Sequence, residues 1–247
     1  MRGGSYILFA RCIPSGECLK CPFRGMSITY GPFRSRRRGV SIGINLFPGK
    51  KVCSFNCVYC FRGETAVKTL EPTEGFYKVD AEILRRALKE ALKEVGEIDA
   101  VDFSGSGEPT LHLRFKEFTD VVRKFTRDLG LGVSIGVFTN SSTLGRDEVV
   151  EALRNLDFVE AKLDTVVQWK FRVINRPHKT LQVSDIIGNL SRFRKVFSGT
   201  LAVQVMLLKY SGVSNYTVRD AELIADALSS VDPDVIHIYT VYRPVSY

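Results

Sequence analysis

The chain has 247 residues, a length that suits one large α/β domain or two small ones. Its 45% of hydrophobic residues can fill a sizeable core, yet no apolar run reaches the roughly 18–20 residues needed to span a bilayer, and the N-terminus is too polar for a secretory signal. We therefore expect a cytoplasmic protein with no membrane partner. The net charge of +8 favours an anionic partner such as RNA, although a basic solvated surface explains it equally well.

The first 38 residues have no regular pattern, and we expect them to form an irregular N-terminal extension. They hold one group of three cysteines, Cys12, Cys18 and Cys21. They also hold an arginine run, formed by Arg34, Arg36, Arg37 and Arg38. Guanidinium groups at this spacing repel one another unless an anion or a carboxylate lies nearby, and arginine is well suited to two-pronged contacts with phosphate or carboxylate.

Residues 39–247 alternate between short apolar runs and helical periods, which predicts parallel βα units. The expected strands are Val40–Phe47, Ile98–Phe103, Val133–Thr139, Phe158–Leu163, Leu201–Leu208 and Val235–Val241. The expected helices are 80–95, 115–129, Asp147–Leu156, Asp185–Phe197 and Thr217–Leu228. Six such units do not complete an eight-stranded barrel, so we predict an open, partial barrel of the α/β class. We expect its catalytic and binding residues to lie at the carboxyl ends of the strands.

A cysteine loop follows the first of these strands, with Cys53, Cys57 and Cys60 in the spacing C-x3-C-x2-C. Three soft sulfur ligands on one loop indicate an iron–sulfur centre or zinc. A structural zinc site needs four ligands, and the three histidines of the chain are distant in sequence, so iron–sulfur is favoured. In a [4Fe–4S] cluster, three cysteines leave one iron open to a small molecule.

The cysteine loop, with Tyr59 before its last cysteine, resembles that of the radical S-adenosylmethionine (SAM) superfamily. The stretches Gly31–Gly39 and Ser41–Leu46 resemble the lead-in of the branch that contains the 4-demethylwyosine synthases. The resemblance implies a partial (β/α)6 barrel. It also implies a [4Fe–4S] cluster that reductively cleaves SAM to a 5′-deoxyadenosyl radical. The electron for this cleavage would come from an external donor of the ferredoxin or flavodoxin type. A tRNA base is the substrate that this branch suggests.

Polar groups at three further strand ends are the candidate SAM contacts. Small residues beside a carboxylate, as in Ser106, Gly107 and Glu108, let a ligand approach the backbone and bind through an ammonium group. By resemblance, this is the Gly-Gly-Glu-Pro element that holds the amino group of SAM, with serine in place of the first glycine. The resemblance also makes Asp164 the ribose contact, and Asn140 offers polar groups to the same mouth. A turn or a helix cap would equally explain these residues singly.

Several alternatives stay open. Cys12, Cys18 and Cys21 could hold a second iron–sulfur cluster, a zinc or redox site, or be three ordinary thiols. The whole protein could instead activate a glycyl-radical enzyme, or be a non-catalytic nucleic-acid-binding module with structural zinc. Residues 169–179 are expected to form a long substrate-binding loop after the fourth strand. No general acid or base is assigned.

Overall fold

A computed structural model describes residues 6–12, 21–35 and 37–241 of the chain. Its main element is an eight-stranded sheet with the order β1-β2-β3-β6-β7-β8-β9-β12. These strands are β1 (Ile7–Arg11), β2 (Ser27–Ser35), β3 (Gly39–Asn45), β6 (Ala100–Ser104), β7 (Ser134–Thr139), β8 (Phe158–Lys162), β9 (Thr200–Leu207) and β12 (Val235–Thr240). From β3 to β12 every neighbouring pair is parallel, so the six predicted strands and their parallel arrangement are confirmed.

The N-terminal segment differs from the irregular extension expected from the sequence, because it adds two strands to one edge of the sheet. β2 pairs antiparallel with β3, with Thr29 opposite Ile44, and β1 runs parallel to β2. The Thr29 hydroxyl donates to the carbonyl of Leu8 at 2.8 Å and lies 3.0 Å from that of Ala87, which ties both strands to the first helix. A strand that pairs with a neighbour running the other way carries no βα signature, so its short apolar run was not recognised as part of the sheet.

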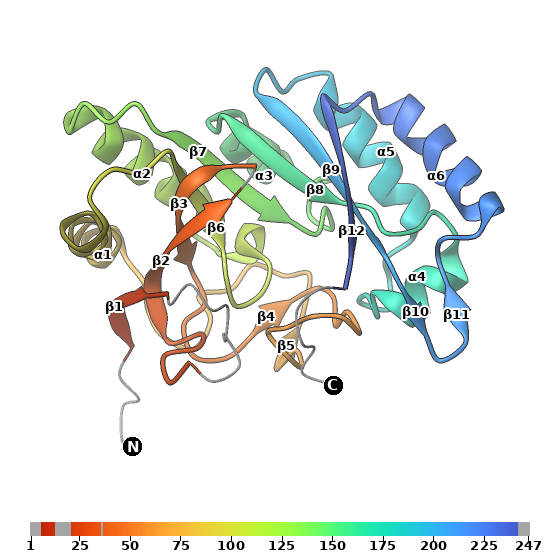
Figure 1. Cartoon of the computed structure of the whole chain (residues 1–247), viewed down its shortest axis with the longest axis horizontal. Helices are drawn as coiled ribbons and strands as arrows, with labels where there is room; N and C mark the ends of the chain where they lie inside the picture. The colour runs from red at the N-terminus through yellow and green to blue at the C-terminus, as the bar shows by residue number, and fades with distance from the viewer. Residues whose placement is uncertain (1–5, 13–20, 36, 242–247) are drawn as a thin grey trace.

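Helices cover the outer face of the sheet. They are α1 (Ala81–Val95), α2 (Phe115–Asp128), α3 (Asp147–Arg154), α4 (Gln168–Ile174), α5 (Val183–Arg194) and α6 (Val218–Val231). Figure 1 shows α1 and α2 at one end of the curved sheet and α5 and α6 at the other. Asp80 caps α1 by accepting from the Ile83 amide at 2.9 Å, as its position in the sequence predicted. The expected loop over 169–179 is wrong in its first half, since α4 occupies Gln168–Ile174.

Short elements complete the chain. β4 (Val52–Cys53) and β5 (Val67–Lys68) form one two-stranded sheet, and β10 (Lys209–Tyr210) and β11 (Val213–Ser214) form another. The 3-10 helix η1 (Pro109–Leu111) follows β6. Within the ranges described above, no helix combines the length and the apolar character that a membrane crossing requires.

The two faces of the sheet differ in polarity, because successive side chains of a strand point to opposite sides. Val101, Val137 and Val159 lie in the core between sheet and helices. The alternate positions on the same strands carry Asp102 and Glu160, both buried, on the inner face. The strands are therefore less uniformly apolar than parallel strands buried on two hydrophobic sides, and the inner face of the curve is a polar surface.

Candidate functional site

The cysteine loop lies across the carboxyl ends of the strands. Cys53 ends β4, and the β4 residue Val52 forms a parallel bridge with Gly107, just after β6. Cys53 and Cys57 are buried, and Cys60 is half-buried. The loop turns back on itself, since the Cys60 amide donates to the Cys57 carbonyl at 3.1 Å. The predicted location of the cysteines at this end of the barrel therefore agrees with the structure.

Each of the two buried thiols receives a hydrogen bond from an asparagine amide. Asn140 Nδ2, after β7, lies 3.4 Å from Cys53 Sγ, and Asn175 Nδ2, after α4, lies 3.6 Å from Cys57 Sγ. Burial raises the pKa of Cys53 to about 12, and the nearby charges of Glu108 and Cys57 add to the rise while Lys51 opposes it. Burial also raises the pKa of Cys57 to about 11, together with the charges of Asp164 and Cys60. Both thiols are therefore protonated at neutral pH, and a bound metal would have to displace their protons.

A buried lysine lies beside the cysteine loop. Lys51 is only 7% exposed, and its ammonium donates to the carbonyl of Gly63 at 2.8 Å. The Gly63 amide in turn donates to the Cys60 carbonyl at 3.0 Å, so the ammonium lies at the turn that follows the last cysteine. Burial by itself lowers the pKa of Lys51, but Cys60, Cys53 and Cys57, in their ionised forms, raise that pKa above its ordinary value.

The donor chemistry of this loop fits an iron–sulfur cluster better than a harder metal ion. In the described part of the chain, no three or more His, Cys, Asp or Glu side chains are already gathered in a metal-binding group. Neutral, protonated thiols are not drawn together when no metal is bound. Metal binding would deprotonate them, and the resulting thiolates would then gather around the metal. Three sulfurs from one loop, amide donors to two of them and a nearby cation are the surroundings that a negatively charged cluster needs.

The Glu108 motif is shaped by close backbone contact. Gly107 has φ +127°, and a Cβ at this position would lie 1.7 Å from the Val52 carbonyl oxygen, so only glycine is accommodated. Ser106 has no such restriction, because its φ is not positive. Gly25, from the N-terminal segment, packs against this serine: a Cβ on Gly25 would lie 2.9 Å from Ser106 Oγ. The serine that departs from the Gly-Gly-Glu-Pro pattern is thus accepted by the fold.

Glu108 is 1% exposed and its carboxylate is held entirely by neutral donors. It accepts from the hydroxyls of Thr110 at 2.7 Å and Thr139 at 2.8 Å, and from the backbone amide of Asn140 at 2.6 Å. Burial raises the pKa of Glu108, although these hydrogen bonds act in the opposite direction. The structure thus brings Glu108 and Asn140 together beside Cys53, while their contact with SAM stays a prediction.

Asp164 joins the cysteine loop to the end of β8. Its carboxylate accepts from the Tyr59 hydroxyl and from Asn175 Nδ2 at 2.6 Å, and Lys162 Nζ lies 3.3 Å from its other oxygen. Burial raises the pKa of Tyr59 well above its ordinary value, and the Asp164 charge adds to this. Two residues predicted as separate SAM contacts, Tyr59 and Asp164, are therefore direct partners of each other.

Of the N-terminal cysteines, Cys18 lies outside the described residues. Cys12 and Cys21 are half-buried at the margin of the sheet, and the Cys12 amide donates to the Gly31 carbonyl at 2.6 Å. Arg24, which follows Cys21, donates to the carbonyl of Phe61 in the cysteine loop. This segment therefore contacts the loop, and a second cluster there remains a prediction.

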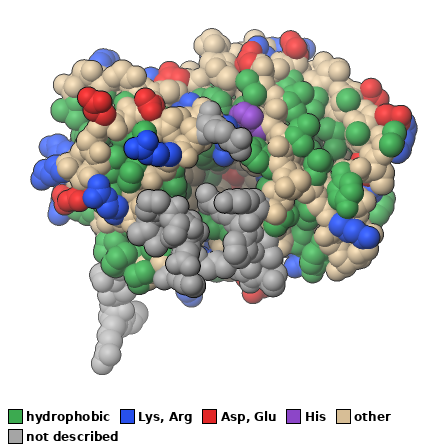
Figure 2. All heavy atoms as spheres, in the orientation of Figure 1, with side chains coloured by type: hydrophobic (Ala, Val, Ile, Leu, Met, Phe, Trp, Pro, Cys, Tyr) green, Lys and Arg blue, Asp and Glu red, His purple; other side chains and the backbone are tan. Residues whose placement is uncertain are grey.

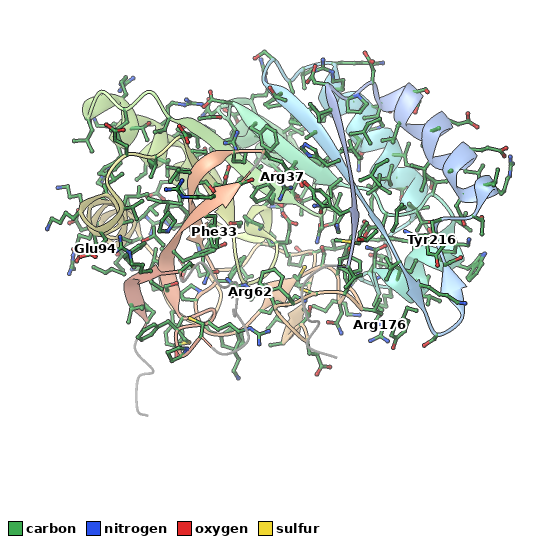
Figure 3. All side chains as sticks on the ribbon, viewed as in Figure 1. Phe33, Arg37, Arg62, Glu94, Arg176 and Tyr216 are labelled. Atoms are coloured by element: carbon green, nitrogen blue, oxygen red, sulfur yellow. The ribbon has the colours of Figure 1, made fainter. Side chains whose placement is uncertain are left out.

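The arginine run is divided by the structure. Arg38 is 8% exposed and pairs with Asp102 at 2.9 Å, with its guanidinium 4.3 Å above the Phe158 ring. Arg37 pairs with Glu160 and lies inside the curve of the sheet (Figure 3). Arg34 is exposed, and Arg36 lies outside the described residues. The compensating charges expected near this run are thus carboxylates of the same chain for Arg37 and Arg38, and these two guanidinium groups are not available to RNA.

Arg37 also contacts aromatic side chains across the inner face of the sheet. Its guanidinium lies 5.3 Å from the centre of the Phe138 ring on β7 and 5.0 Å from that of Tyr239 on β12. Cation–π contacts of this kind, together with the Glu160 pair, link the β2–β3 turn to strands that are not its neighbours in the sheet.

Comparison with known proteins settles the family. The model of the Radical SAM superfamily matches residues 49–229, which include the cysteine loop and the ends of β6, β7 and β8. The chain belongs to the radical SAM superfamily. Its members are SAM-dependent iron–sulfur enzymes, so the predicted class and cofactors are confirmed at the level of the superfamily. The wyosine branch and the individual ligands remain predictions.

A curated relative and two solved structures place the chain further. A UPF0026 protein of Methanocaldococcus jannaschii is 35% identical over 223 residues, which cover 90% of this chain and 65% of that protein. The chain thus spans just under two thirds of that relative. Streptococcus suis SuiB bound to S-adenosylmethionine superposes with a TM-score of 0.54 at 16% identity, over 82% of this chain and 41% of SuiB. Kitasatospora setae TsrM, a methyltransferase with cobalamin and a [4Fe–4S] cluster bound, gives 0.56 at 15% identity, over 83% and 35%. These likenesses show the fold.

Two residues in the radical SAM site had no role assigned from the sequence. Lys51 stands two residues before Cys53, but its sequence position alone does not show that the loop folds over it and buries its ammonium. Asn175 was included in the expected loop, but its contacts with Cys57 and Asp164 depend on α4, which was not expected. Both are brought to the site by tertiary structure.

Proposed function

We propose that Cys53, Cys57 and Cys60 hold the [4Fe–4S] cluster of this radical SAM enzyme, and that Glu108, Asn140, Asp164 and their neighbours bind SAM. When bound and reduced by an external one-electron donor, such a cluster supplies the electron that splits SAM into methionine and a 5′-deoxyadenosyl radical. The observation that supports the proposal most is that the cysteine loop, with Cys53 and Cys57 buried, lies at the same end of the sheet as Glu108 and Asp164.

The residues of the chain contribute binding, orientation and exclusion of water. Asn140 and Asn175 orient Cys53 and Cys57 by hydrogen bonds to sulfur. Glu108 accepts from Thr139 on β7, and Asp164 accepts from the Met206 amide on β9 and pairs with Lys162, so both carboxylates are preorganised before a ligand arrives. By resemblance, Glu108 would bind the amino group of SAM and Asp164 its ribose. The small residues Ser106 and Gly107 would let SAM approach the backbone closely.

The test is anaerobic reconstitution with iron and sulfide, followed by dithionite and SAM. We expect a brown chromophore and the release of 5′-deoxyadenosine, measured by liquid chromatography. A Cys57→Ala variant prepared in parallel should give neither. A wild-type sample that is fully loaded with iron and binds SAM, yet releases no 5′-deoxyadenosine, would contradict the proposal. Zinc in place of iron would favour the structural module.

A tRNA base is the proposed substrate, and its support is the net charge of +8 and the likeness of the lead-in sequence. Figure 2 shows basic side chains at several separate places on one face, with acidic ones near some of them. Because Arg37 and Arg38 are paired with carboxylates, these two members of the arginine run give no support for RNA. The test of a tRNA substrate is to compare the modified nucleosides of tRNA from a deletion strain and from the same strain complemented with the gene. Identical profiles would favour another substrate, such as a partner protein.

A further inference from the structure

Lys51 is unusual among the lysines of the described chain in how its charge is compensated. The ammonium is nearly inaccessible to water, so it needs an opposite charge or several hydrogen bonds to be stable there. Its oxygen acceptor is the Gly63 carbonyl, at 2.8 Å. No ion pair joins it to a carboxylate of the described residues, and the Gly63 amide donates to the Cys60 carbonyl at 3.0 Å, which places the ammonium at the turn that follows Cys60.

Other lysines show the ordinary arrangements. Lys170 is buried nearly as deeply, and it pairs with the carboxylate of Asp220 at 2.6 Å. Lys162, at the end of β8, has Asp164 at 3.3 Å and Gln204 at 2.8 Å. Lys50, the immediate neighbour of Lys51, is exposed and lies 4.9 Å from the Phe76 ring. The environment of Lys51 is therefore a property of the cysteine loop and not of the local sequence.

The three sulfurs of this loop also have distinct donors. Cys53 receives a hydrogen bond from Asn140 at 3.4 Å, and Cys57 receives one from Asn175 at 3.6 Å, both from neutral amides. Cys60 begins the turn to which the ammonium of Lys51 is bound, through the carbonyl of Gly63. A single full positive charge thus lies beside the group of sulfurs.

We propose that Lys51 is a positioning residue of the cluster site, whose ammonium compensates the negative charge of the cysteine thiolates and of the cluster that they hold. This rests on the proposed function, since it requires a cluster on Cys53, Cys57 and Cys60. Reduction adds one electron and one negative charge to the cluster, with the electron coming from the external donor and no bond of the protein changing. A fixed positive charge stabilises the reduced form more than the oxidised form, because net charge and hydrogen bonds to sulfur set the potential of such clusters. Lys51 would thereby make the cluster easier to reduce.

The experiment compares Lys51→Gln, which can still donate to the Gly63 carbonyl, with Lys51→Arg, which keeps the charge. Lys50→Gln is the matched control, because it removes one positive charge from the adjacent position without touching the loop. Each protein is reconstituted anaerobically, its iron and sulfide are measured, and the cluster is titrated with reductant and followed by electron paramagnetic resonance. We expect Lys51→Gln to shift the reduction equilibrium about tenfold toward the oxidised form, which corresponds to about 59 mV for one electron. For Lys51→Arg and Lys50→Gln, the equilibrium constant for reduction should stay within about threefold of the wild-type value, which is less than half of the tenfold shift on a logarithmic scale.

Each outcome decides the question. A wild-type potential in Lys51→Gln overturns the proposal, and so does an equal shift in Lys50→Gln. If Lys51→Gln fails to retain iron while Lys51→Arg retains it, the charge is required even for assembly, which supports the proposal. If both lose iron equally, the charge is not what matters and the proposal fails. A wild-type protein that binds no cluster refutes the proposed function instead, and this result is seen before any variant is compared.

Discussion

Two regions of the inner face of the sheet stabilise buried charge in different ways. Midway along β6 and β8, Arg38 pairs with Asp102, and Arg37 with Glu160. At the carboxyl ends, Glu108 is held by hydroxyls and a backbone amide, and Lys51 donates to the Gly63 carbonyl. Charges that neutralise each other have no capacity for a further charged ligand. A carboxylate held by neutral donors has no opposite charge beside it, so it can still attract a cation such as the ammonium group of SAM.

The largest effect should come from removing a sulfur at the carboxyl end. Cys57→Ala takes away a proposed ligand, and we expect bound iron to fall to background in reconstituted protein. Asn175→Ala keeps all three sulfurs and removes one donor to Cys57, so it should weaken iron binding by about 10–100-fold, the usual cost of losing a hydrogen-bonding neighbour of a ligand. Iron retained by Cys57→Ala at the wild-type level would break the comparison.

Midway along the strands, the expected effect is on folding. Asp102→Ala leaves Arg38 buried without its partner, and we expect the free energy of unfolding to fall by about 3–5 kcal/mol in urea titrations. Adding Arg38→Met should recover part of that loss, because the uncompensated charge is then gone. A cost below about 1 kcal/mol for the single variant, as for an exposed ion pair, would contradict the structural role of this pair.

A buried histidine near the carboxyl end gives a pH dependence. His112 is 3% exposed, and its Nδ1 accepts from the Arg114 amide at 3.1 Å. Burial lowers the pKa of His112 from 6.5 to about 4, with the Arg114 charge contributing. The unfolded chain therefore binds a proton between these two pH values that the folded chain does not, so stability is fully present above pH 6.5 and falls as the pH drops toward 4.

Over that interval the folded protein should lose about 3 kcal/mol relative to a His112→Asn variant, in which this titration is absent. The measurement is the difference in unfolding free energy between the two proteins at several pH values. A difference that does not change between pH 7 and pH 4 would show that His112 takes up its proton at the same pH in the folded and the unfolded chain, which would contradict the lowered pKa.

The smallest effect is expected from one neutral donor. Thr139→Val removes a single hydroxyl from Glu108, whose carboxylate keeps the Asn140 amide and Thr110. We expect a loss of about 1 kcal/mol in unfolding free energy, the usual net value of one hydrogen bond, and bound iron unchanged. A loss as large as that of Asp102→Ala would mean that the two regions stabilise charge in the same way.

Much of the fold could be predicted from the sequence, because parallel strands and their helices leave local patterns. The six strands from β3 to β12 and five of the six helices follow from apolar runs and helical periods. The cysteine loop and Glu108 could be placed together because the carboxyl ends of parallel strands meet at one edge. These inferences needed only the order of elements along the chain.

What could not be predicted depends on contacts between distant segments. β1 and β2 join the sheet by pairing with β3, and nothing in their own sequence specifies that partner. α4 has only seven residues and no side-chain cap, so its pattern is too short to recognise. Lys51, Asn175 and the pairing of Arg37 with Glu160 are all set by how loops fold onto the sheet.

The contact between Gly25 and Ser106 has a consequence for evolution. Because a Cβ at Gly25 would press on the Ser106 hydroxyl, the two positions are expected to vary together among relatives. Where the Glu108 motif has serine at the first of its two small positions, glycine should be retained at the position of Gly25. Where that motif has two glycines, the earlier position is free to accept asparagine, which tolerates a positive φ such as the +77° found here. Such covariation would connect the N-terminal segment with the cofactor site through inheritance, far apart as they are in the chain.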